Sequence, residues 1–242
     1  MITSTTNSTI KQIRKLKQKK YRDQNKQFLI ESMHLIQEAI KHKSLELVIT
    51  TDENYNLSTE YIVVSSNVFE ALSNQQSSSG YIGLCTYLNN EIDYNSDIIA
   101  IDRIQDPGNC GTILRNALAF NYKNIIMNLN SVDIYNPKTI QASQGAIFGL
   151  NIISEDLLDN IDKYKANNYK LIGTSIENAK TLNKNTTINE KTMIFLGNEG
   201  QGMSKELLNK MDTNFFIPID NIDSLNVASA SAIMFYQLSQ KN

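Results

Sequence analysis

The second half of this 242-residue chain alternates apolar, strand-like runs with helix-like runs, and this alternation constrains the fold more than any other feature. Strands are expected over residues 98–102, 124–127, 169–174, 193–196 and 215–219, and helices over 109–120, 138–142, 204–211 and 224–238. Strands that alternate with helices form mainly parallel sheets with helices on both faces. The sequence therefore predicts an α/β fold for residues 98–242.

Three polar clusters each follow one of these strands and lead into a helix. They are residues 106–111 (DPGNCG) together with Arg115, residues 197–202 (GNEGQG), and residues 224–226 (SLN). Open α/β sheets bind their ligands at the carboxyl ends of the strands. We therefore expect the three clusters to meet at one edge of the sheet and to form a ligand site.

The first cluster combines a tight turn with the start of a helix. Residues 106–108 favour the turn, and Asn109 is expected to be the N-cap of the helix. Because helical side chains lean toward the amino terminus, Arg115 can reach back across Gly111 toward Asn109. A guanidinium there suits a phosphate or a developing oxyanion, and the alternative is an arginine that only caps its own loop.

The second cluster surrounds Glu199 with glycines directly after an apolar strand. Glycines let a backbone approach a ligand closely, so this loop is either a cofactor cradle or a plain structural turn. The spacing of Gly197, Gly200 and Gly202 fits neither a dinucleotide fingerprint nor a Walker loop. In the third cluster, Ser224 is expected to cap the last helix and Asn226 to lie in its first turn.

Residues 1–43 form a basic segment on an otherwise acidic chain. This segment contains ten Lys and Arg residues and three acidic residues, Asp23, Glu31 and Glu38, so its net charge is +7. The rest of the chain has a net charge of −9. Lysine and arginine displace counterions from phosphates, so the segment predicts a nucleic-acid partner; the alternative is a solvated helix face. The candidate RNA contacts are Lys17, Lys19, Lys20 and Arg22.

Residues 1–90 and 98–242 are expected to form two domains, with the polar stretch 89–97 as the linker. The only two cysteines, Cys85 and Cys110, have neither disulfide-scaffold nor zinc-site spacing. No run of about eighteen apolar residues and no apolar signal core is present. We expect a soluble cytoplasmic protein.

Taken together and in this order, the clusters resemble the SpoU/TrmH family of RNA 2′-O-methyltransferases, within the SPOUT superfamily. The resemblance lies in residues 109–115 (NCGTILR), 195–202 (FLGNEGQG), 217–219 (IPI) and 224–228 (SLNVA), with NPK at 136–138 and ASQGA at 142–146 between them. Residues 1–88, notably KKYR at 19–22 and FLIE at 28–31, resemble the small α/β RNA-binding domain of members that modify ribosomal RNA.

This resemblance implies a trefoil-knotted methyltransferase domain, S-adenosylmethionine as the cofactor, no metal, and a homodimer that acts on RNA, most simply ribosomal RNA. The positions that match the family's catalytic set are Asn109, Arg115, Glu199, Ser224 and Asn226. The cofactor would be held by backbone near Leu196, Gly197, Ile217 and Leu225, with Thr174 as a further candidate. The chain departs from the family at Gln141, where relatives commonly have Arg, and at Asn121 and Ser32, where they frequently have Gly.

Three other functions are weighed against rRNA methylation. A tRNA 2′-O-methyltransferase would carry the same motifs, and a catalytically inactive RNA-binding protein of ribosome assembly would retain the fold. The intact catalytic set argues against the inactive protein. A dinucleotide-dependent oxidoreductase is excluded because the glycine fingerprint is missing.

Overall fold

The computed structural model describes residues 1–75, 80–175 and 178–240 of the chain. These residues form two compact units, one of residues 1–89 with 135–148 and the other of residues 90–134 with 149–242. Among the described residues, no helix is both long and apolar enough to cross a membrane. We call residues 1–89 with 135–148 the amino-terminal unit, and residues 90–134 with 149–242 the catalytic unit.

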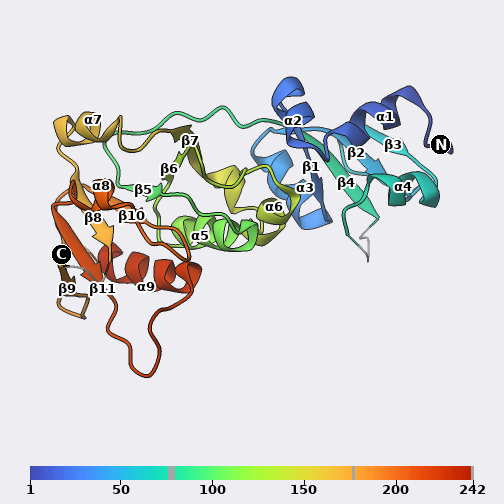
Figure 1. Ribbon diagram of the computed structural model, residues 1–242. Coiled ribbons are helices and arrows are strands. Elements are labelled where there is room, and N and C mark those ends of the chain that lie inside the picture. The colour runs from blue at the N-terminus through green and yellow to red at the C-terminus, as the bar shows by residue number, and fades with distance from the viewer. Residues whose placement is uncertain (76–79, 176–177, 241–242) are drawn as a thin grey trace. The chain divides into compact units, whose positions relative to one another are not determined.

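The amino-terminal unit contains a four-stranded sheet of order β1-β4-β2-β3 (Figure 1). β4 runs antiparallel to both of its neighbours, whereas β2 and β3 are parallel. Apolar residues of α1 and α4, including Ile10 and Val68, are buried against Ile49 and Ile82 of the sheet. The elements are α1 (Ser8–Lys15), α2 (Lys19–Asn25), β1 (Gln27–Glu31), α3 (Met33–Lys41), β2 (Leu45–Thr50), β3 (Tyr61–Val63), α4 (Ser66–Leu72), β4 (Tyr81–Thr86) and α6 (Pro137–Ser143).

Residues 8–20, within the basic segment 1–43, are divided between the two helices α1 and α2, although their composition is compatible with one helix. α1 ends at Lys15, and the buried Leu16 is its C-cap. The guanidinium of Arg22, on α2, donates to the carbonyl oxygens of Leu16 (2.9 Å) and Lys17 (3.0 Å). The last carbonyls of a helix have no partner within it, so Arg22 stabilises the break by supplying donors.

Residues 135–148 pack with the amino-terminal strands, although they lie within the range 98–242. The Tyr135 ring stacks on Tyr87 with 3.8 Å between centroids, and its hydroxyl accepts from the backbone N–H of Leu88 (2.9 Å). The side chain of Gln141 accepts a hydrogen bond from that of Gln75 (3.1 Å). The segment is therefore part of the amino-terminal unit.

The catalytic unit is built on a seven-stranded sheet of order β7-β6-β5-β10-β8-β11-β9, and all of its strand pairs are parallel (Figure 1). Its strands are β5 (Ile98–Ile101), β6 (Asn124–Asn128), β7 (Asn151–Glu155), β8 (Lys170–Thr174), β9 (Ala179–Thr181), β10 (Thr192–Leu196) and β11 (Thr213–Phe216). The central strands β5 and β10 are buried along their whole length, as strands covered on both faces require. The predicted α/β fold with a mainly parallel sheet is confirmed, whereas the trefoil knot stays a prediction.

The helices of the catalytic unit are α5 (Pro107–Ala119), α7 (Ile161–Ala166), α8 (Lys205–Leu208) and α9 (Val227–Ser239), and the 3₁₀ turn η1 (Ala146–Gly149) precedes β7. α5 and α9 lie side by side (Figure 1). The Asn116 side chain on α5 donates to the carbonyl of Ala228 and the hydroxyl of Ser231 on α9, at 2.9 Å each. Small residues of α9 permit this close packing, which fixes the start of α9 beside α5.

At two of the positions where the resemblance led us to expect glycine, the backbone has a conformation that favours glycine. Asn121 has φ = +65°, and Ser32 has φ = +145°. Side chains are disfavoured at positive φ, although asparagine tolerates the left-handed region better than most residues. A glycine would therefore suit the backbone conformation at both positions.

Candidate active site

The carboxyl ends of four adjacent strands, β5, β10, β8 and β11, lie along one edge of the catalytic sheet. Thr174 ends β8, Leu196 ends β10, and Ile217 directly follows β11. The Thr174 hydroxyl donates to the carbonyl of Phe195 on the neighbouring strand (2.9 Å). The structure thus brings three of the predicted cofactor residues to the edge from which the three polar clusters start.

Asp106, and not Asn109, is the N-cap of α5. Its carboxylate accepts from the backbone N–H of Asn109 (2.7 Å), and Pro107 occupies the first helical position. The prediction that Asn109 caps this helix was wrong, because proline is favoured at the first position and an aspartate before it is a strong cap. Asn109 lies in the first turn, and its side chain does not cap the helix.

Asn226, and not Ser224, is the N-cap of α9. Its side-chain oxygen accepts from the backbone N–H groups of Ala228 (2.9 Å) and Ser229 (3.3 Å). The predictions that Ser224 caps the helix and that Asn226 lies in its first turn were therefore wrong. Ser224 is exposed and makes no hydrogen bond with any described residue.

A chain of hydrogen bonds joins the three clusters. The Asn226 amide donates to the side-chain oxygen of Asn109 (2.9 Å), and the Asn109 amide donates to Glu199 Oε1 (3.2 Å). Glu199 Oε1 also accepts from the backbone N–H of Asp106 (3.1 Å), and Oε2 accepts from that of Gln105 (3.3 Å). One carboxylate therefore holds the turn before α5 and, through Asn109, the start of α9.

The hydrogen bonds around Glu199 determine its ionisation. Burial opposes the charged form, but the donated hydrogen bonds, including those from Asp106 and Asn109, hold the pKa of Glu199 below its ordinary value. Glu199 is therefore ionised above the ordinary glutamate pKa of about 4.3. It takes up a proton only as the pH falls through the lower pKa that Glu199 has in the folded protein. At neutral pH the group is an acceptor only.

Glu199→Gln is expected to lower the activity of this site about tenfold, because the new amide nitrogen would face backbone and side-chain N–H donors that now meet a carboxylate oxygen. Protonation of Glu199 should lower the activity of the wild type below about pH 4.3, and the variant should not show this decrease. Rate measurements against pH test both expectations. An activity equal to wild type would show that the carboxylate is dispensable for the site.

Arg115 is exposed on α5, and its side chain makes no hydrogen bond or ion pair with any described residue. Its predicted reach toward Asn109 is therefore not a hydrogen bond within the protein. The alternative, in which Arg115 only caps its own loop, is not supported either, because its side chain makes no hydrogen bond to that loop among the described residues. An exposed guanidinium on the helix that carries Asn109 can meet a substrate.

Sequence reasoning missed Asp102 and Arg103, which directly follow β5. The Asp102 carboxylate is fully buried and accepts from Arg103 Nε (3.1 Å) and from the amide of Asn128 (2.8 Å). Arg103 also donates to the carbonyl of Gly202 (3.2 Å), and its own carbonyl accepts from the side chain of Asn198 (2.8 Å). The pair fixes the glycine-containing loop to the end of β5. In the sequence, the only signal for this role was that two charged residues directly follow an apolar strand.

The loop of residues 197–202 is a tight hairpin. Asn198 and Gly202 exchange backbone hydrogen bonds of 3.1 and 2.9 Å, and the side-chain oxygen of Asn198 accepts from the N–H groups of Gly200 and Gln201. A Cβ on Gly197 would lie 2.3 Å from the backbone nitrogen of Met203. Gly197 must therefore be glycine for the loop to close.

The backbone at this edge suits a ligand rich in polar groups. The N–H groups of Gly197, Ile217 and Leu225 donate no hydrogen bond to any described residue. Unpaired backbone donors next to a glycine, where no side chain blocks the approach, are what a nucleoside ligand needs. The residues present thus fit the cofactor that the resemblance implied.

The four basic residues predicted to contact RNA differ in their surroundings. Lys19 is 61% exposed and pairs with Asp23 (2.6 Å), and Lys20 is exposed. Lys17 donates to the carbonyl of Ser73 (2.7 Å), and burial lowers its pKa. Arg22 is only 4% exposed and stabilises the end of α1, so it does not lie where an RNA phosphate could reach it.

Comparison with known proteins decides the family. The model of the SpoU rRNA Methylase family matches residues 96–236. The chain belongs to this family. The model of the MRM3-like substrate binding domain matches residues 7–83. The predicted family and the prediction of an RNA methyltransferase are confirmed.

Relatives of this SpoU methylase match nearly its whole length. RlmP, the 23S rRNA (guanosine(2553)-2′-O)-methyltransferase of Bacillus subtilis strain 168, is 30% identical over 98% of each chain. The AdoMet-bound rRNA methyltransferase of Sinorhizobium meliloti has a TM-score of 0.86 at 25% identity and covers 98% of this chain and 95% of its own. A structure described as an RNA 2′-O ribose methyltransferase has a TM-score of 0.83 at 27% identity, covering 98% and 96%.

Proposed function

We propose that this SpoU methylase transfers the methyl group of S-adenosylmethionine to a ribose 2′-hydroxyl of 23S ribosomal RNA. The observation that carries the proposal is the hydrogen-bond chain from Asn226 through Asn109 to Glu199, which joins all three motifs in one place. Similarity to RlmP over nearly the whole chain favours ribosomal RNA over tRNA.

The cofactor supplies, when bound, an electrophilic methyl group on a sulfonium. The backbone N–H groups of Gly197, Ile217 and Leu225, which have no partner among the described residues, would hold its polar groups. Leu196 and Thr174, at the ends of their strands, would border it. The hairpin at 197–202 keeps Gly197 in place, and no side chain intervenes there. This cradle consists mainly of backbone, so it does not depend on the catalytic side chains.

The remaining residues act on the ribose. A 2′-hydroxyl is a poor nucleophile at neutral pH, so it must be held in line with the methyl group, and its proton must pass to solvent water as the new carbon–oxygen bond forms. Arg115 binds the adjacent phosphate and stabilises negative charge as it develops on the 2′-oxygen. Guanidinium groups keep their protons near neutral pH, which makes Arg115 a donor of hydrogen bonds. Asn109, Asn226 and Ser224 orient the ribose, and Glu199 positions Asn109.

Methyl transfer from isotope-labelled S-adenosylmethionine to protein-free 23S rRNA tests the function. The RNA should be isolated from a strain that lacks the chain, and the product mapped for ribose methylation. One new 2′-O-methyl group is expected in 23S rRNA. Methylation of tRNA alone would overturn the choice of substrate, and a folded protein that binds RNA without binding the cofactor would favour the inactive assembly protein.

Lys19 and Lys20 are proposed as phosphate contacts of the amino-terminal unit. Replacing both with glutamine should weaken RNA binding and flatten its salt dependence by about one unit of slope for each phosphate that is no longer neutralised. Fluorescence anisotropy over a salt series measures this, with the Lys41→Gln, Lys43→Gln double variant as a control that removes the same charge from exposed positions at the end of α3 and just after it. Equal slopes for the two double variants would show that Lys19 and Lys20 belong to a solvated face.

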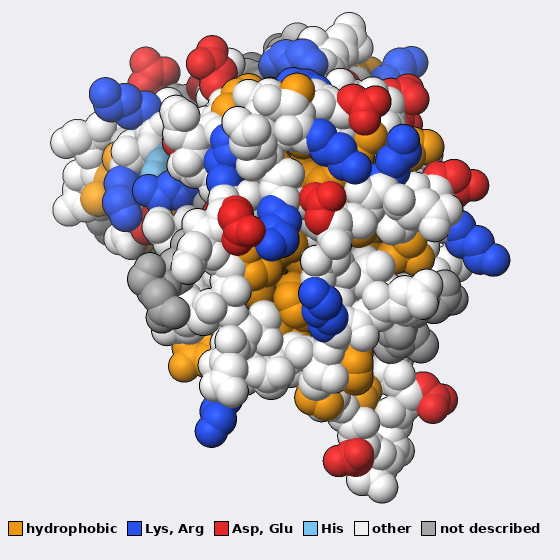
Figure 2. Space-filling model, turned by 90° about the vertical axis from the view of Figure 1, so that its left-hand side faces the viewer, with side chains coloured by type: hydrophobic (Ala, Val, Ile, Leu, Met, Phe, Trp, Pro, Cys, Tyr) orange, Lys and Arg blue, Asp and Glu red, His pale blue; other side chains and the backbone are white. Residues whose placement is uncertain are grey.

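A homodimer is also proposed. α9 leaves Ile233 (42%) and Tyr236 (57%) exposed, and the Phe120 ring at the end of α5 packs edge-on against Tyr236. On the face shown in Figure 2, acidic and basic side chains are interspersed around apolar side chains that reach the surface. Exposed apolar side chains on one helix face favour a protein partner, and a second copy of the chain is the simplest one.

A further inference from the structure

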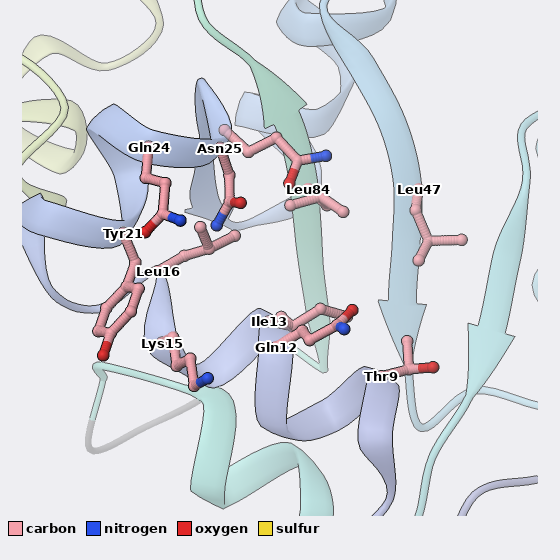
Figure 3. Close-up of a pocket in the computed structure, with 11 residues that line it drawn as sticks. Thr9, Gln12, Ile13, Lys15, Leu16, Tyr21, Gln24, Asn25, Leu47 and Leu84 are labelled. Atoms are coloured by element: carbon pink, nitrogen blue, oxygen red, sulfur yellow. The ribbon is translucent and has the colours of Figure 1, made fainter.

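The amino-terminal unit holds a pocket of about 420 Å³ between α1, α2 and the sheet (Figure 3). Its apolar lining comes from Ile13 and Leu16 at the end of α1 and from Leu47 and Leu84 on β2 and β4. Ligand pockets commonly measure about 300–1,000 Å³, so this one has room for a small planar group. The apolar lining provides the surface against which the face of such a group could pack.

The border of the pocket is rich in side-chain amides. Gln24 and Asn25 extend from α2 toward the apolar lining, and Gln12 lies across from them on α1 (Figure 3). None of these three side chains makes a hydrogen bond with any described residue. A fourth amide, that of Gln27 on β1, donates to the carboxylate of Glu46. Amides offer donors and acceptors together, which is the combination that pairs with the edges of nucleobases.

An aromatic ring flanked by two cations lies at one side of the pocket. The ammonium groups of Lys15 and Lys20 are 5.4 and 5.9 Å from the centre of the Tyr21 ring. Tyr21 and Lys15 both line the pocket. Aromatic side chains stack on unpaired bases, and nearby lysines bind the adjoining phosphates. The same +7 segment that attracts RNA thus surrounds an apolar, amide-bordered pocket.

We infer that this pocket binds one unpaired nucleotide of the RNA substrate, with the base on the apolar lining, its edge on the amides and its phosphate on Lys15 or Lys20. The inference rests on the proposed RNA methylation and adds a specific contact to it. A base held in the amino-terminal unit is not the reacting nucleotide. It therefore contributes to RNA binding and leaves the methyl-transfer step unchanged.

Gln12→Trp tests the inference, because an indole at this exposed position would occupy the pocket. Gln37→Trp is the matched control, since Gln37 is an exposed glutamine on α3 that does not line the pocket. In the 23S rRNA assay, Gln12→Trp should raise the KM for RNA about tenfold, the order expected for one stacked base. The kcat and the affinity for S-adenosylmethionine should stay within about twofold of wild type.

A second variant removes the amides without filling the pocket. Gln24→Ala with Asn25→Ala should also raise the KM for RNA, and both side chains are exposed, so folding is expected to tolerate the change. An unchanged KM in both variants, or an equal rise in Gln37→Trp, would overturn the pocket assignment. Wild-type protein that methylates no RNA would instead count against the proposed function, which separates the two failures.

Discussion

Arg115→Ala is expected to lower the rate of methyl transfer on the order of a hundredfold or more, the effect of removing one preorganised donor at a developing oxyanion. Cofactor affinity should change little, because the proposed cradle is backbone near Gly197, Ile217 and Leu225. The exposed side chain of Arg115 makes no hydrogen bond with a described residue, so its removal leaves no partner unsatisfied. Single-turnover rates with saturating cofactor and 23S rRNA, together with calorimetry of cofactor binding, measure the two effects.

Arg115→Lys separates charge from geometry. A lysine supplies a point charge but not the planar fork of a guanidinium, so it should restore little of the missing rate. Arg14→Ala is a matched control, since Arg14 is an exposed arginine on the helix α1 and is assigned no role in catalysis. Near-wild-type turnover in Arg115→Ala would contradict the mechanism, whatever the lysine variant does.

The central strands of the catalytic sheet could be predicted from the sequence because burial on both faces makes them continuous apolar runs. β5 and β10 are buried at every position. The edge strands β7 and β9 are partly exposed and carry polar residues, so they resembled loops and were not predicted. Hydrophobic pattern thus identifies the strands that position the site better than the strands that border the sheet.

The helix starts show what local sequence can and cannot decide. Pro107 predicts a helix that begins there, with Asp106 as its cap, yet the nearby Asn109 offered a competing capping side chain. Ser224 and Asn226 posed the same choice before α9. Several residues in one short loop can cap a helix, and packing against the rest of the protein selects among them.

The hydrogen bonds between the motifs lay beyond local reasoning. Asn109 is 90 residues from Glu199 and 117 residues from Asn226, and only the fold makes them hydrogen-bond partners. The resemblance to a family identified these three as a set, but it gave no role to Arg103. Charge alone also treated Arg22 as equal to Lys19, although one is buried and the other is exposed.

Gly197→Ala is expected to abolish cofactor binding at concentrations that saturate the wild type. The added Cβ would lie 2.3 Å from the nitrogen of Met203 and 2.5 Å from the carbonyl carbon of Gly202, and both are backbone atoms. The hairpin must therefore shift, and with it the carbonyl that binds Arg103 and the loop that carries Glu199. A displacement of about 1 Å at a site can cost on the order of a hundredfold in rate.

Gly200→Ala is the matched control in the same loop. A Cβ there would meet only the side-chain oxygen of Asn198, at the ordinary contact distance of 3.8 Å. Calorimetry should therefore find cofactor affinity close to wild type in Gly200→Ala and undetectable binding in Gly197→Ala, while circular dichroism shows both proteins folded. Equal affinity in the two variants would mean that the hairpin does not border the cofactor. The cradle would then have to lie among the ends of β8 and β11 alone, and Gly197 would be required only by the turn that it makes.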